Sequence, residues 1–341
     1  MLPPLRFVPT LKARSWGGSR LQHYGKPAIP GARLSETWEV ADLPDSIDGG
    51  QSIVDGGALA GLSLRAVRNA HRADLLGIAT AADDGAFPIL VKYLDAAENL
   101  SMQVHPDANY VRAHPNTHLK TEAWIIVECD VGARVYRGIR PSTTSAAFYA
   151  ALAAGNVLEH IECLEVSPGD CVYLPSGTCH ALGGGILAAE VQTPSDTTFR
   201  VWDWDRNDPS RPLHLEQAKQ CTKFGADQND GVAGFVRAQD APSFEVDGIT
   251  TRRLCRSKFF AVEWLQTRNA SSIAIDATGI PEVWMTTAGR AQWKTTSGVV
   301  DAPKGVSILR PAAVEPGEII LDAGTTLLRF ICASPLDRAL A

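Results

Sequence analysis

Four side chains within residues 103–180 are of the types that bind a divalent metal ion: Gln103, His105, Glu122 and His180. Gln103 and His105 are two residues apart, so on a strand both point to the same face. Glu122 begins an apolar run. Two imidazole nitrogens, a carboxylate and an amide oxygen suit Zn²⁺ with an open coordination position, at ligand distances of about 2.0–2.2 Å. We therefore predict that these four residues bind one zinc ion per chain.

His180 is the last residue of a sequence motif that spans residues 169–180. Gly169, Pro175, Gly177 and His180 are separated by five, one and two residues, a spacing similar to the second sequence motif of cupin barrels. Gly169 can turn the chain into a strand, and Pro175 with Gly177 can end that strand in a tight turn. The histidine then enters the next strand, where we expect its ring to point into a barrel.

Short apolar runs that could position these residues recur along the whole chain. They are bounded by Gly, Pro or charged residues, as strands are, and lie at 90–94, 123–127, 171–174, 186–189, 259–264, 283–286, 307–309 and 326–331. Their spacing of about 10–25 residues favours antiparallel barrels. The predicted fold class is all-β, with tandem cupin (jelly-roll) barrels.

Two segments have helical patterns instead. In 142–160, strong helix formers lie between a possible cap at Ser142 to Thr144 and a stop at Gly155-Asn156, which predicts a small helical insert. Residues 213–221 predict a second helix.

Three regions follow from this pattern. Residues 1–221 are predicted to form the metal-binding catalytic cupin domain, 222–242 a surface connection, and 243–341 a second cupin domain. In the second domain Gly305 and Pro311 repeat the motif spacing, but Ala312 to Glu315 stand where a Gly and a His should follow. Since no histidine follows His214, we predict a degenerate, metal-free barrel there.

Composition narrows the possible partners and compartment. The chain has 341 residues, 45% of them hydrophobic and 21% charged, and a formal net charge of -6. This charge, without a block of Lys and Arg, argues against nucleic acid as the main partner. No apolar run approaches the ~18 residues of a membrane span, and no signal peptide is evident. Seven cysteines without C-x-x-C spacing predict reduced thiols, so we expect a cytoplasmic protein.

The chain also resembles a known family, the type I mannose-6-phosphate isomerases (phosphomannose isomerases) of the cupin superfamily, in a compact bacterial branch. The resemblance extends over residues 5–215; after 240 it is only architectural. It is carried, besides the 169–180 motif, by Trp16–Gly18, Ser35–Val40, Phe87–Lys92, Asn99–Pro106, Lys120–Glu122, Gly185–Glu190 and Ser195–Arg206.

This resemblance implies an activity and a set of roles. It implies zinc-dependent interconversion of mannose 6-phosphate and fructose 6-phosphate, with the metal held by the four residues named above. It also implies that Lys120, Glu190 and Arg200 act at the reacting carbons, and that Ser101 and Lys92 lie toward the phosphate end of the substrate. Ser101 and Gln103 share a strand face in the i, i+2 relation, as Lys120 and Glu122 do.

One departure from the family pattern limits what can be transferred. Many members have a His directly before the residue matching Lys120 and a Pro after it, whereas this chain has Leu119 and Thr121. No role of that His is transferred. The insert at 142–160 is shorter than in longer members, which predicts a more open site.

The implied reaction moves a carbonyl between C1 and C2 through an enediol-like intermediate. Zn²⁺ would orient the substrate and neutralise the negative charge that develops on oxygen. Arg200, a permanent cation, would stabilise the same oxyanion. Either Lys120 or Glu190 could be the base that removes the proton, and the sequence does not decide between them.

Three alternatives remain open at this point. A sugar-binding cupin without activity could keep the metal pocket, although it need not keep Lys120, Glu190 and Arg200. A cupin dioxygenase would use Fe²⁺ and a His-rich ligand set, which Gln103 fits poorly. The enzyme could also isomerise a different sugar. The expected partner is a small-molecule sugar phosphate, with no membrane contact, and the chain would be a monomer or a homodimer.

Overall fold

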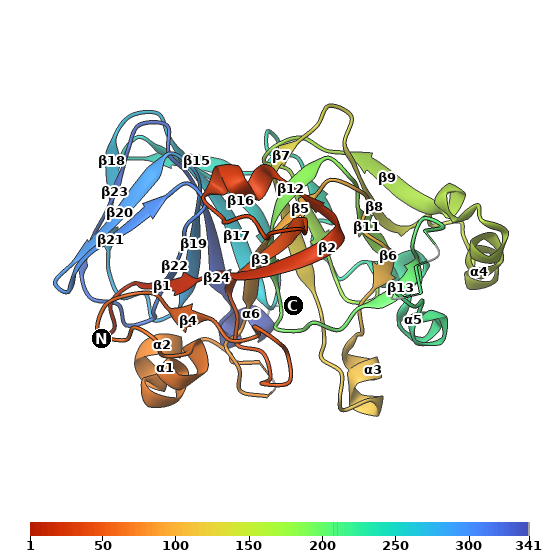
Figure 1. The fold of residues 1–341 in the computed structure, drawn as a ribbon, viewed down its shortest axis with the longest axis horizontal. Coiled ribbons are helices and arrows are strands. Elements are labelled where there is room, and N and C mark those ends of the chain that lie inside the picture. The colour runs from red at the N-terminus through yellow and green to blue at the C-terminus, as the bar shows by residue number, and fades with distance from the viewer. Residues whose placement is uncertain (83, 207, 210, 340–341) are drawn as a thin grey trace.

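The computed structural model describes residues 1–82, 84–206, 208–209 and 211–339. Each apolar run predicted to be a strand lies within one, except that the strand expected at 259–264 begins at Phe260. The strands pair antiparallel and form two barrels that lie side by side (Figure 1). The all-β fold with tandem barrels and a small helical insert is therefore confirmed.

The first barrel consists of two facing sheets. The seven-stranded sheet has the order β14 (Phe235–Val236), β10 (Cys171–Leu174), β7 (Glu122–Cys129), β12 (Ile186–Gln192), β5 (Leu90–Ala96), β2 (Thr10–Gly18), β3 (Leu34–Val40). The five-stranded sheet has the order β13 (Phe199–Trp202), β6 (Met102–Val104), β11 (His180–Leu182), β8 (Arg134–Ile139), β9 (Ile161–Glu165).

The second barrel is built in the same way. Its eight-stranded sheet has the order β15 (Ser243–Val246), β16 (Ile249–Arg256), β17 (Phe260–Thr267), β24 (Thr326–Cys332), β19 (Glu282–Ala288), β22 (Ser307–Arg310), β1 (Leu5–Val8), β4 (Ile53–Val54). Its four-stranded sheet has the order β18 (Ser271–Ile275), β23 (Gly317–Leu321), β20 (Arg290–Thr295), β21 (Gly298–Pro303).

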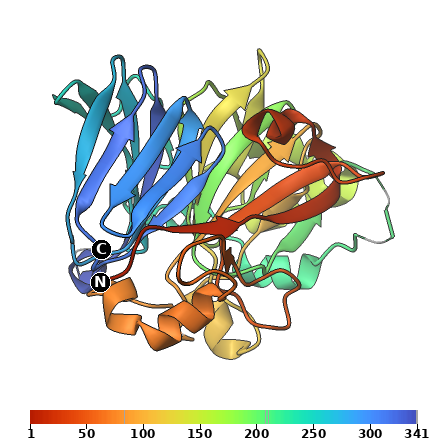
Figure 2. The ribbon, with the colours of Figure 1, turned by 60° about the vertical axis from the view of Figure 1, so that its left-hand side comes forward.

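The sheets cross the predicted region boundaries in two places. β1, at the N-terminus, pairs with β22, with Leu5 opposite Leu309, and so belongs to the second barrel. Figure 2 shows this N-terminal segment running beside the C-terminal strands before it enters the first barrel. β14, within the expected connection, pairs with β10 of the first barrel. The division of the chain at 222–242 stays a prediction.

The helices lie outside the barrels (Figure 1). They are α1 (Leu64–Ala70), α2 (Arg72–Leu76), α3 (Ala108–Ala113), α4 (Ser145–Ala154), α5 (Leu215–Cys221), α6 (Pro335–Ala339) and the 3-10 turns η1 (Arg20–Tyr24), η2 (Val157–His160), η3 (Gly225–Gln228). The predicted insert is α4 with η2: Thr144 caps it by accepting from the Ala147 N–H, and Gly155 ends it in a left-handed conformation. The predicted second helix is α5. None of the helices in the described ranges is long and apolar enough to cross a membrane.

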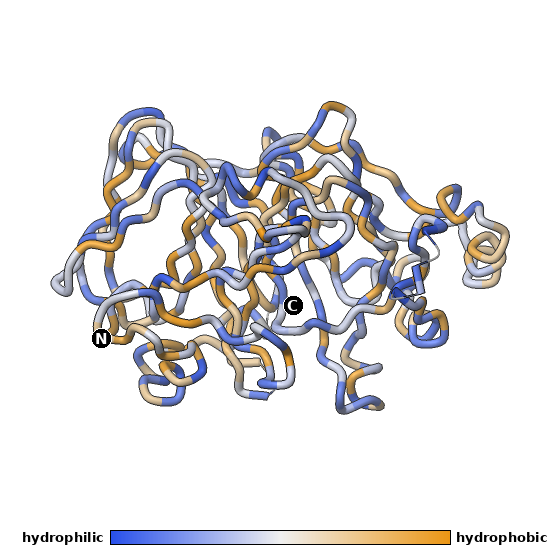
Figure 3. Tube along the Cα trace, in the orientation of Figure 1, coloured by the Kyte–Doolittle hydropathy of each residue, from blue (hydrophilic) through white to orange (hydrophobic). Residues whose placement is uncertain are grey.

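The seven-stranded sheet is buried on both faces, because it is also the wall between the barrels. On β7, Ile125 packs toward the second barrel, while Trp124 and Ile126 point into the first. On β5, Tyr93 packs toward the second barrel and Leu94 into the first. A strand covered on both faces has an unbroken apolar run rather than an alternating one. Figure 3 shows apolar segments recurring along these central strands.

The interior of the second barrel is filled with apolar side chains. Trp284 and Trp293 meet edge to face, with ring centroids 5.6 Å apart, among aliphatic side chains such as Ile308. The interior of the first barrel differs, since one end of it carries polar residues.

Candidate active site

The inward face of the seven-stranded sheet presents a row of functional side chains. Lys92 on β5, Glu190 on β12 and Trp124 on β7 are direct neighbours across the strands, Glu190 between the other two. They alternate along the strands with residues that face the second barrel, such as Tyr93 and Ile125. The two-residue period of the strand thus brings a cation, a carboxylate and an indole to one place inside the barrel.

The facing five-stranded sheet presents a second row. Gln103 on β6 lies opposite Arg200 on β13 and opposite His180 on β11. The outward neighbours on these strands, including Val104 and Ala181, pack among apolar side chains under α4 and α5. Arg200, Gln103 and His180 therefore point toward the row on the other sheet.

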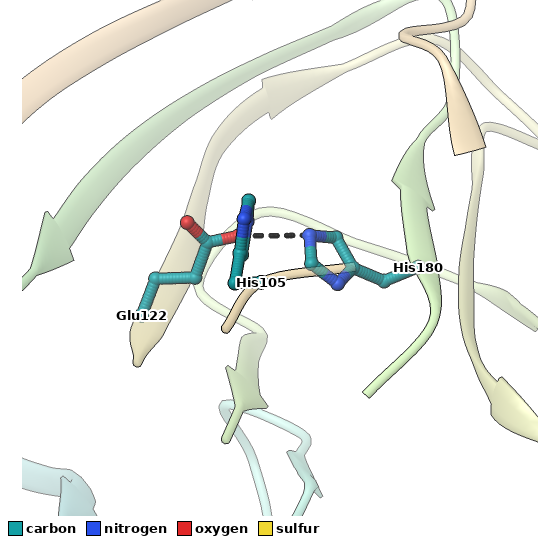
Figure 4. Close-up of side chains that lie close together, drawn as sticks. All are labelled: His105, Glu122 and His180. Carbon is teal, nitrogen blue, oxygen red and sulfur yellow. Dashed lines mark ion pairs between the residues drawn. The ribbon is translucent and has the colours of Figure 1, made fainter. Parts of the chain in front are cut away.

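Three of the four predicted ligands form a buried cluster, shown in Figure 4. The candidate ligand atoms of His105, Glu122 and His180 all lie within 4.8 Å of one another. Oε1 of Glu122 is 3.0 Å from Nε2 of His180 and 3.4 Å from Nε2 of His105. Each of the three side chains is at most 1% exposed. This is the arrangement of donors that a divalent metal ion needs.

The hydrogen bonds of the two imidazoles set which nitrogen faces the cluster. Nδ1 of His105 lies 3.1 Å from the carbonyl oxygen of Thr197, and Nδ1 of His180 lies 2.8 Å from that of Thr178. A proton on each Nδ1 satisfies these carbonyls and leaves a lone pair on each Nε2, as in metal-binding histidines. Nε2 of His105 and Oε1 of Glu122 are buried without a hydrogen bond in the described part of the chain. These residues fit a metal ion.

Charges around the cluster keep its ligands in the forms that bind metal. Burial, then the nearby Lys120 ammonium, lowers the pKa of His105 to about 3, so its ring is neutral. For Glu122 burial acts to raise the pKa, but the charge of the Lys120 ammonium outweighs it and holds the pKa well below its usual range. Nζ of Lys120 lies 2.9 Å from Oε2 of Glu122, so the carboxylate is held ionised by a direct ion pair.

The fourth predicted ligand lies beside the other three. The amide nitrogen of Gln103 is 3.2 Å from Nε2 of His180. A half-turn of the amide exchanges nitrogen for oxygen, and the two orientations differ only in the hydrogen bonds they satisfy. Gln103 can thus offer its oxygen at the same point.

A cavity of about 440 Å³ between the two sheets lies beside the cluster, because Gln103 and Lys120 contact the cluster and line the cavity. The cavity is lined by Gln103 and by the five other residues predicted from the sequence: Lys92, Ser101, Lys120, Glu190 and Arg200. All nine predicted site residues therefore lie in or beside one cavity. Its size suits a small phosphorylated sugar.

Glu190 is held by both of its oxygens. Oε1 lies 3.1 Å from Nζ of Lys92, and Oε2 accepts a hydrogen bond of 2.8 Å from the indole N–H of Trp124. Lys92 also lies 3.6 Å from Glu36. Burial acts to lower the pKa of Lys92, but Glu190, Glu36 and Glu122 outweigh it and raise it. Lys92 is therefore a charged lysine between carboxylates.

Ser101 belongs to a different contact group. Its hydroxyl donates to Oδ1 of Asp203 at 2.6 Å and accepts from Nη2 of Arg211 at 2.6 Å. Arg211 also donates from Nε to Oδ2 of Asp203 at 3.2 Å. This contact group connects Ser101, directly before β6, with Arg211, in the segment before α5. Arg211 also lines the cavity.

Comparison with known proteins decides the family. Residues 5–124 match the family model described as phosphomannose isomerase type I, catalytic domain. The mannose-6-phosphate isomerase ManA of Bacillus subtilis is 40% identical over 273 residues, which are 79% of this chain and 81% of that protein. The chain belongs to the type I phosphomannose isomerase family.

Other members of the family agree with this assignment. The mannose-6-phosphate isomerase of Streptococcus mutans is 34% identical over 265 residues, covering 77% of this chain and 78% of that protein. A crystal structure of the mannose 6-phosphate isomerase from Bacillus subtilis superposes with a TM-score of 0.83 at 26% identity, covering 96% of this chain and 99% of that one.

Several cavity residues of this family member were not predicted from the sequence. They are Lys12, Arg14, Glu36, Trp38, Trp124 and Arg211. Glu36 and Trp38 lie in one of the segments that carry the family resemblance, and Trp124 lies two residues from the ligand Glu122, so strand parity could have placed Trp124. Arg211 lies in none of the motifs described above, so no signal in the sequence pointed to it.

A larger cavity, of about 640 Å³, lies where residues 231–242 meet the second barrel. It is lined mainly by apolar side chains, such as Val236, Phe260 and Ile331, and contains none of the predicted residues. The smaller, polar cavity is therefore the candidate active site.

Proposed function

We propose that this protein is a zinc-dependent mannose-6-phosphate isomerase. The observation that carries the proposal is that the cluster of His105, Glu122 and His180 directly contacts Gln103 and Lys120. These two residues line the same cavity as Glu190 and Arg200. Relatives named mannose-6-phosphate isomerase support the substrate, because they match most of this chain.

The metal would be held by Gln103, His105, Glu122 and His180. Two imidazoles, a carboxylate and an amide oxygen, with no cysteine, favour Zn²⁺ in a site that keeps a position open. When bound, the ion would supply positive charge to polarise the substrate oxygens at C1 and C2. The ion's identity and its number per chain remain part of the proposal.

The side chains of the protein would carry out the proton transfer. Glu190 and Lys120 both line the cavity, and either could take the proton from the carbon next to the carbonyl. Arg200 enters from the opposite sheet, where its guanidinium can stabilise the oxyanion of an enediol intermediate. Because Lys92 and Trp124 occupy both oxygens of Glu190, this carboxylate has a fixed position from which to act.

The residues around Lys92 favour a role other than the predicted one at the phosphate end of the substrate. Its neighbours Glu190 and Glu36 favour a function in holding Glu190 in place rather than in binding an anion. Ser101, beside Arg211, is better placed for the predicted contact with phosphate. A cytoplasmic location and a monomeric or homodimeric state remain predictions.

The test is an assay of the purified protein with mannose 6-phosphate, coupled to metal analysis. We expect fructose 6-phosphate to form, about one zinc per chain, loss of activity on dialysis against a chelator, and recovery on adding Zn²⁺. A Glu122→Gln variant should fold but hold little zinc. Full activity in metal-free protein would refute the zinc requirement, and absence of turnover in the zinc-loaded protein would favour a binding function.

Replacing Arg200 by alanine tests the oxyanion contact. We expect kcat to fall by about 10²- to 10³-fold, as for other lost oxyanion donors, with zinc content unchanged. Steady-state kinetics and metal analysis of the same preparation check this. An unchanged kcat would remove Arg200 from the reaction.

A further inference from the structure

The charges in the cavity divide into two regions. Near the metal cluster each lysine is paired with a carboxylate: Lys120 with Glu122, and Lys92 with both Glu190 and Glu36. The lysines there are already neutralised. Because both lysines have carboxylate partners, neither is free to serve mainly as a phosphate ligand.

The other region of the cavity carries three arginines from three different elements: Arg14 on β2, Arg200 on β13 and Arg211 in the segment before α5. Burial and then the neighbouring charge of Arg211 lower the pKa of Arg200, and Arg14 contributes in the same direction. Asp203 and Asp208 oppose this effect. The three guanidinium groups therefore lie close enough to repel one another, and a shared anion would relieve that repulsion.

Arg211 has a fixed position in this group. Its side chain is 12% exposed, and it is held through Nε and Nη2 by Asp203 and by the hydroxyl of Ser101. Among the residues that the structure describes, Nη1 of this guanidinium has no hydrogen-bond partner and can take another acceptor. A guanidinium whose rotamer is fixed in this way loses little conformational freedom when it binds an anion.

Arg14 approaches from the opposite side of the cavity mouth. Its side chain is 49% exposed, and its Nε lies 3.9 Å from Oε1 of Glu36. That distance is too long for a hydrogen bond, and Nη1 makes only a long hydrogen bond of 3.3 Å to the carbonyl oxygen of Ala13. The donors of Arg14 can therefore turn toward an anion. The exposed carboxylate of Asp196 also lines the mouth, where solvent screens it.

We infer that Arg14 and Arg211 form the subsite for the phosphate monoester of the substrate, with Ser101 and Asp203 holding Arg211 in place. The phosphate then lies at the end of the cavity that holds Arg14 and Arg211, and the reacting carbons lie between Arg200 and the metal cluster. Bidentate guanidinium contacts recognise phosphate oxygens by geometry as well as charge, so these residues select phosphorylated sugars over free ones. This inference rests on the proposed isomerase function.

The experiment compares Arg14→Gln and Arg211→Gln with the wild type and with a matched control, Arg33→Gln. Arg33 is an exposed arginine in an ion pair with Glu98, at a different cavity. Binding of inorganic phosphate is measured by calorimetry, and KM and kcat with mannose 6-phosphate by the coupled assay. Circular dichroism and thermal melting confirm that each variant is folded.

We expect the Kd for phosphate and the KM for mannose 6-phosphate to rise about 10- to 100-fold in each cavity variant, and neither to change in Arg33→Gln. Arg211→Lys should bind phosphate more tightly than Arg211→Gln but less tightly than the wild type, because lysine keeps the positive charge and lacks the bidentate guanidinium. Unchanged phosphate Kd and KM in the folded variants, or no phosphate binding by the wild type, would overturn the inference. If Arg211→Gln fails to fold, the exposed Arg14→Gln decides alone.

The two proposals fail in different ways. If the wild type binds phosphate through Arg14 and Arg211 but does not convert mannose 6-phosphate, the isomerase function falls and the phosphate subsite stands. If it converts the substrate and both variants behave as the wild type, only the subsite falls.

Discussion

At the scale of single residues, the behaviour of Glu190 depends on two neighbours that bind its two oxygens. Lys92 supplies charge from one adjacent strand, and Trp124 supplies an N–H from the other. The indole of Trp124 also packs edge-on against the ring of His180, with centroids 5.3 Å apart. One buried tryptophan therefore connects the carboxylate of the proposed proton transfer with a ligand of the proposed metal site.

Replacing Trp124 by phenylalanine should show what this contact contributes. The change keeps an aromatic ring but removes the N–H that holds Oε2 of Glu190. A hydrogen bond to a charged group is worth about 1.5–3 kcal/mol, so we expect kcat to fall about tenfold or more with zinc content unchanged. Steady-state kinetics provide the measurement.

The second barrel offers a matched control. The indole of Trp284 donates to Glu282 at 2.8 Å in the same kind of bond, far from the cavity residues. Trp284→Phe should lower stability without lowering kcat in proportion. Equal effects of the two substitutions on kcat would mean that the role of Trp124 is only structural.

At the scale of elements, the turn between β10 and β11 places His180. Gly177 has φ of 90°, and a Cβ there would lie 2.8 Å from the carbonyl oxygen of Cys221 and from the side chain of Lys223. Its N–H donates to the carbonyl oxygen of His105. The turn thus contacts the segment of one ligand while it leads into the strand of another.

Gly177→Ala should therefore impair both stability and metal binding. A left-handed backbone costs an alanine about 1–2 kcal/mol, and the contact with Cys221 adds to it. Gly132→Ala is the control, since Gly132 has φ of 76° and nothing within 4 Å of its ideal Cβ. Denaturant unfolding and zinc titration should show the larger loss of stability, and a loss of zinc affinity, only at Gly177.

The junction of β13 and α5 predicts a pH dependence. Nδ1 of His214 accepts from the N–H of Arg200, and burial, followed by the charge of Arg200, lowers the pKa of His214. The folded state therefore holds this proton less tightly than the unfolded state, whose histidine pKa is about 6.5. Its contribution to stability is fully present above that value and is lost as the pH falls toward the folded pKa.

Unfolding free energies of the wild type and His214→Asn, measured at pH 7.5, 6 and 5, test this dependence. We expect the wild type to lose more stability than the variant over this range. His23→Asn, at an exposed position in η1, should leave the pH dependence as in the wild type. The same slope in His214→Asn would show that other groups cause the dependence.

At the scale of the whole molecule, a buried charge group connects the barrels. Lys26 lies 2.7 and 2.8 Å from the two oxygens of Glu39 on β3, which also accept from Thr37 and from Ser307 of the second barrel. The side chains of Lys26 and Glu39 are 5% and 4% exposed. The group is embedded in the apolar wall beside Tyr93, over whose ring Lys26 lies.

Replacing one partner of the Lys26–Glu39 pair should lower the free energy of unfolding strongly, and replacing both should lower it much less. Lys26→Met leaves the buried carboxylate of Glu39 without its cation, so we expect a loss of about 3–5 kcal/mol in the free energy of unfolding. The double variant Lys26→Met with Glu39→Leu should recover most of this loss. Denaturant unfolding provides the values, and additive effects of the two single changes would contradict the expected coupling.

Local patterns predicted many of the elements. The strands at 171–174 and 186–189 are found because unbroken apolar runs mark strands buried on both faces, and α4 because its cap and stop residues are local. The short helices α1 and α3 were not predicted, although Ser63 and Asp107 cap them, because one or two turns give little periodicity. The entry of β1 into the second barrel was also missed, since its partner β22 lies some 300 residues away in the sequence.

The sequence by itself determined which side chains could bind a metal, because residue types and the two-residue period of strands are local properties. It also determined the family and the succession of strands. Only the tertiary structure decided that Arg200, Gln103 and His180 form one row, and that Trp124 and Lys92 hold Glu190. Only the tertiary structure brought Arg14 and Arg211 to one cavity. Which strands become neighbours depends on the burial of apolar faces across the whole chain, and no short stretch of sequence contains that information.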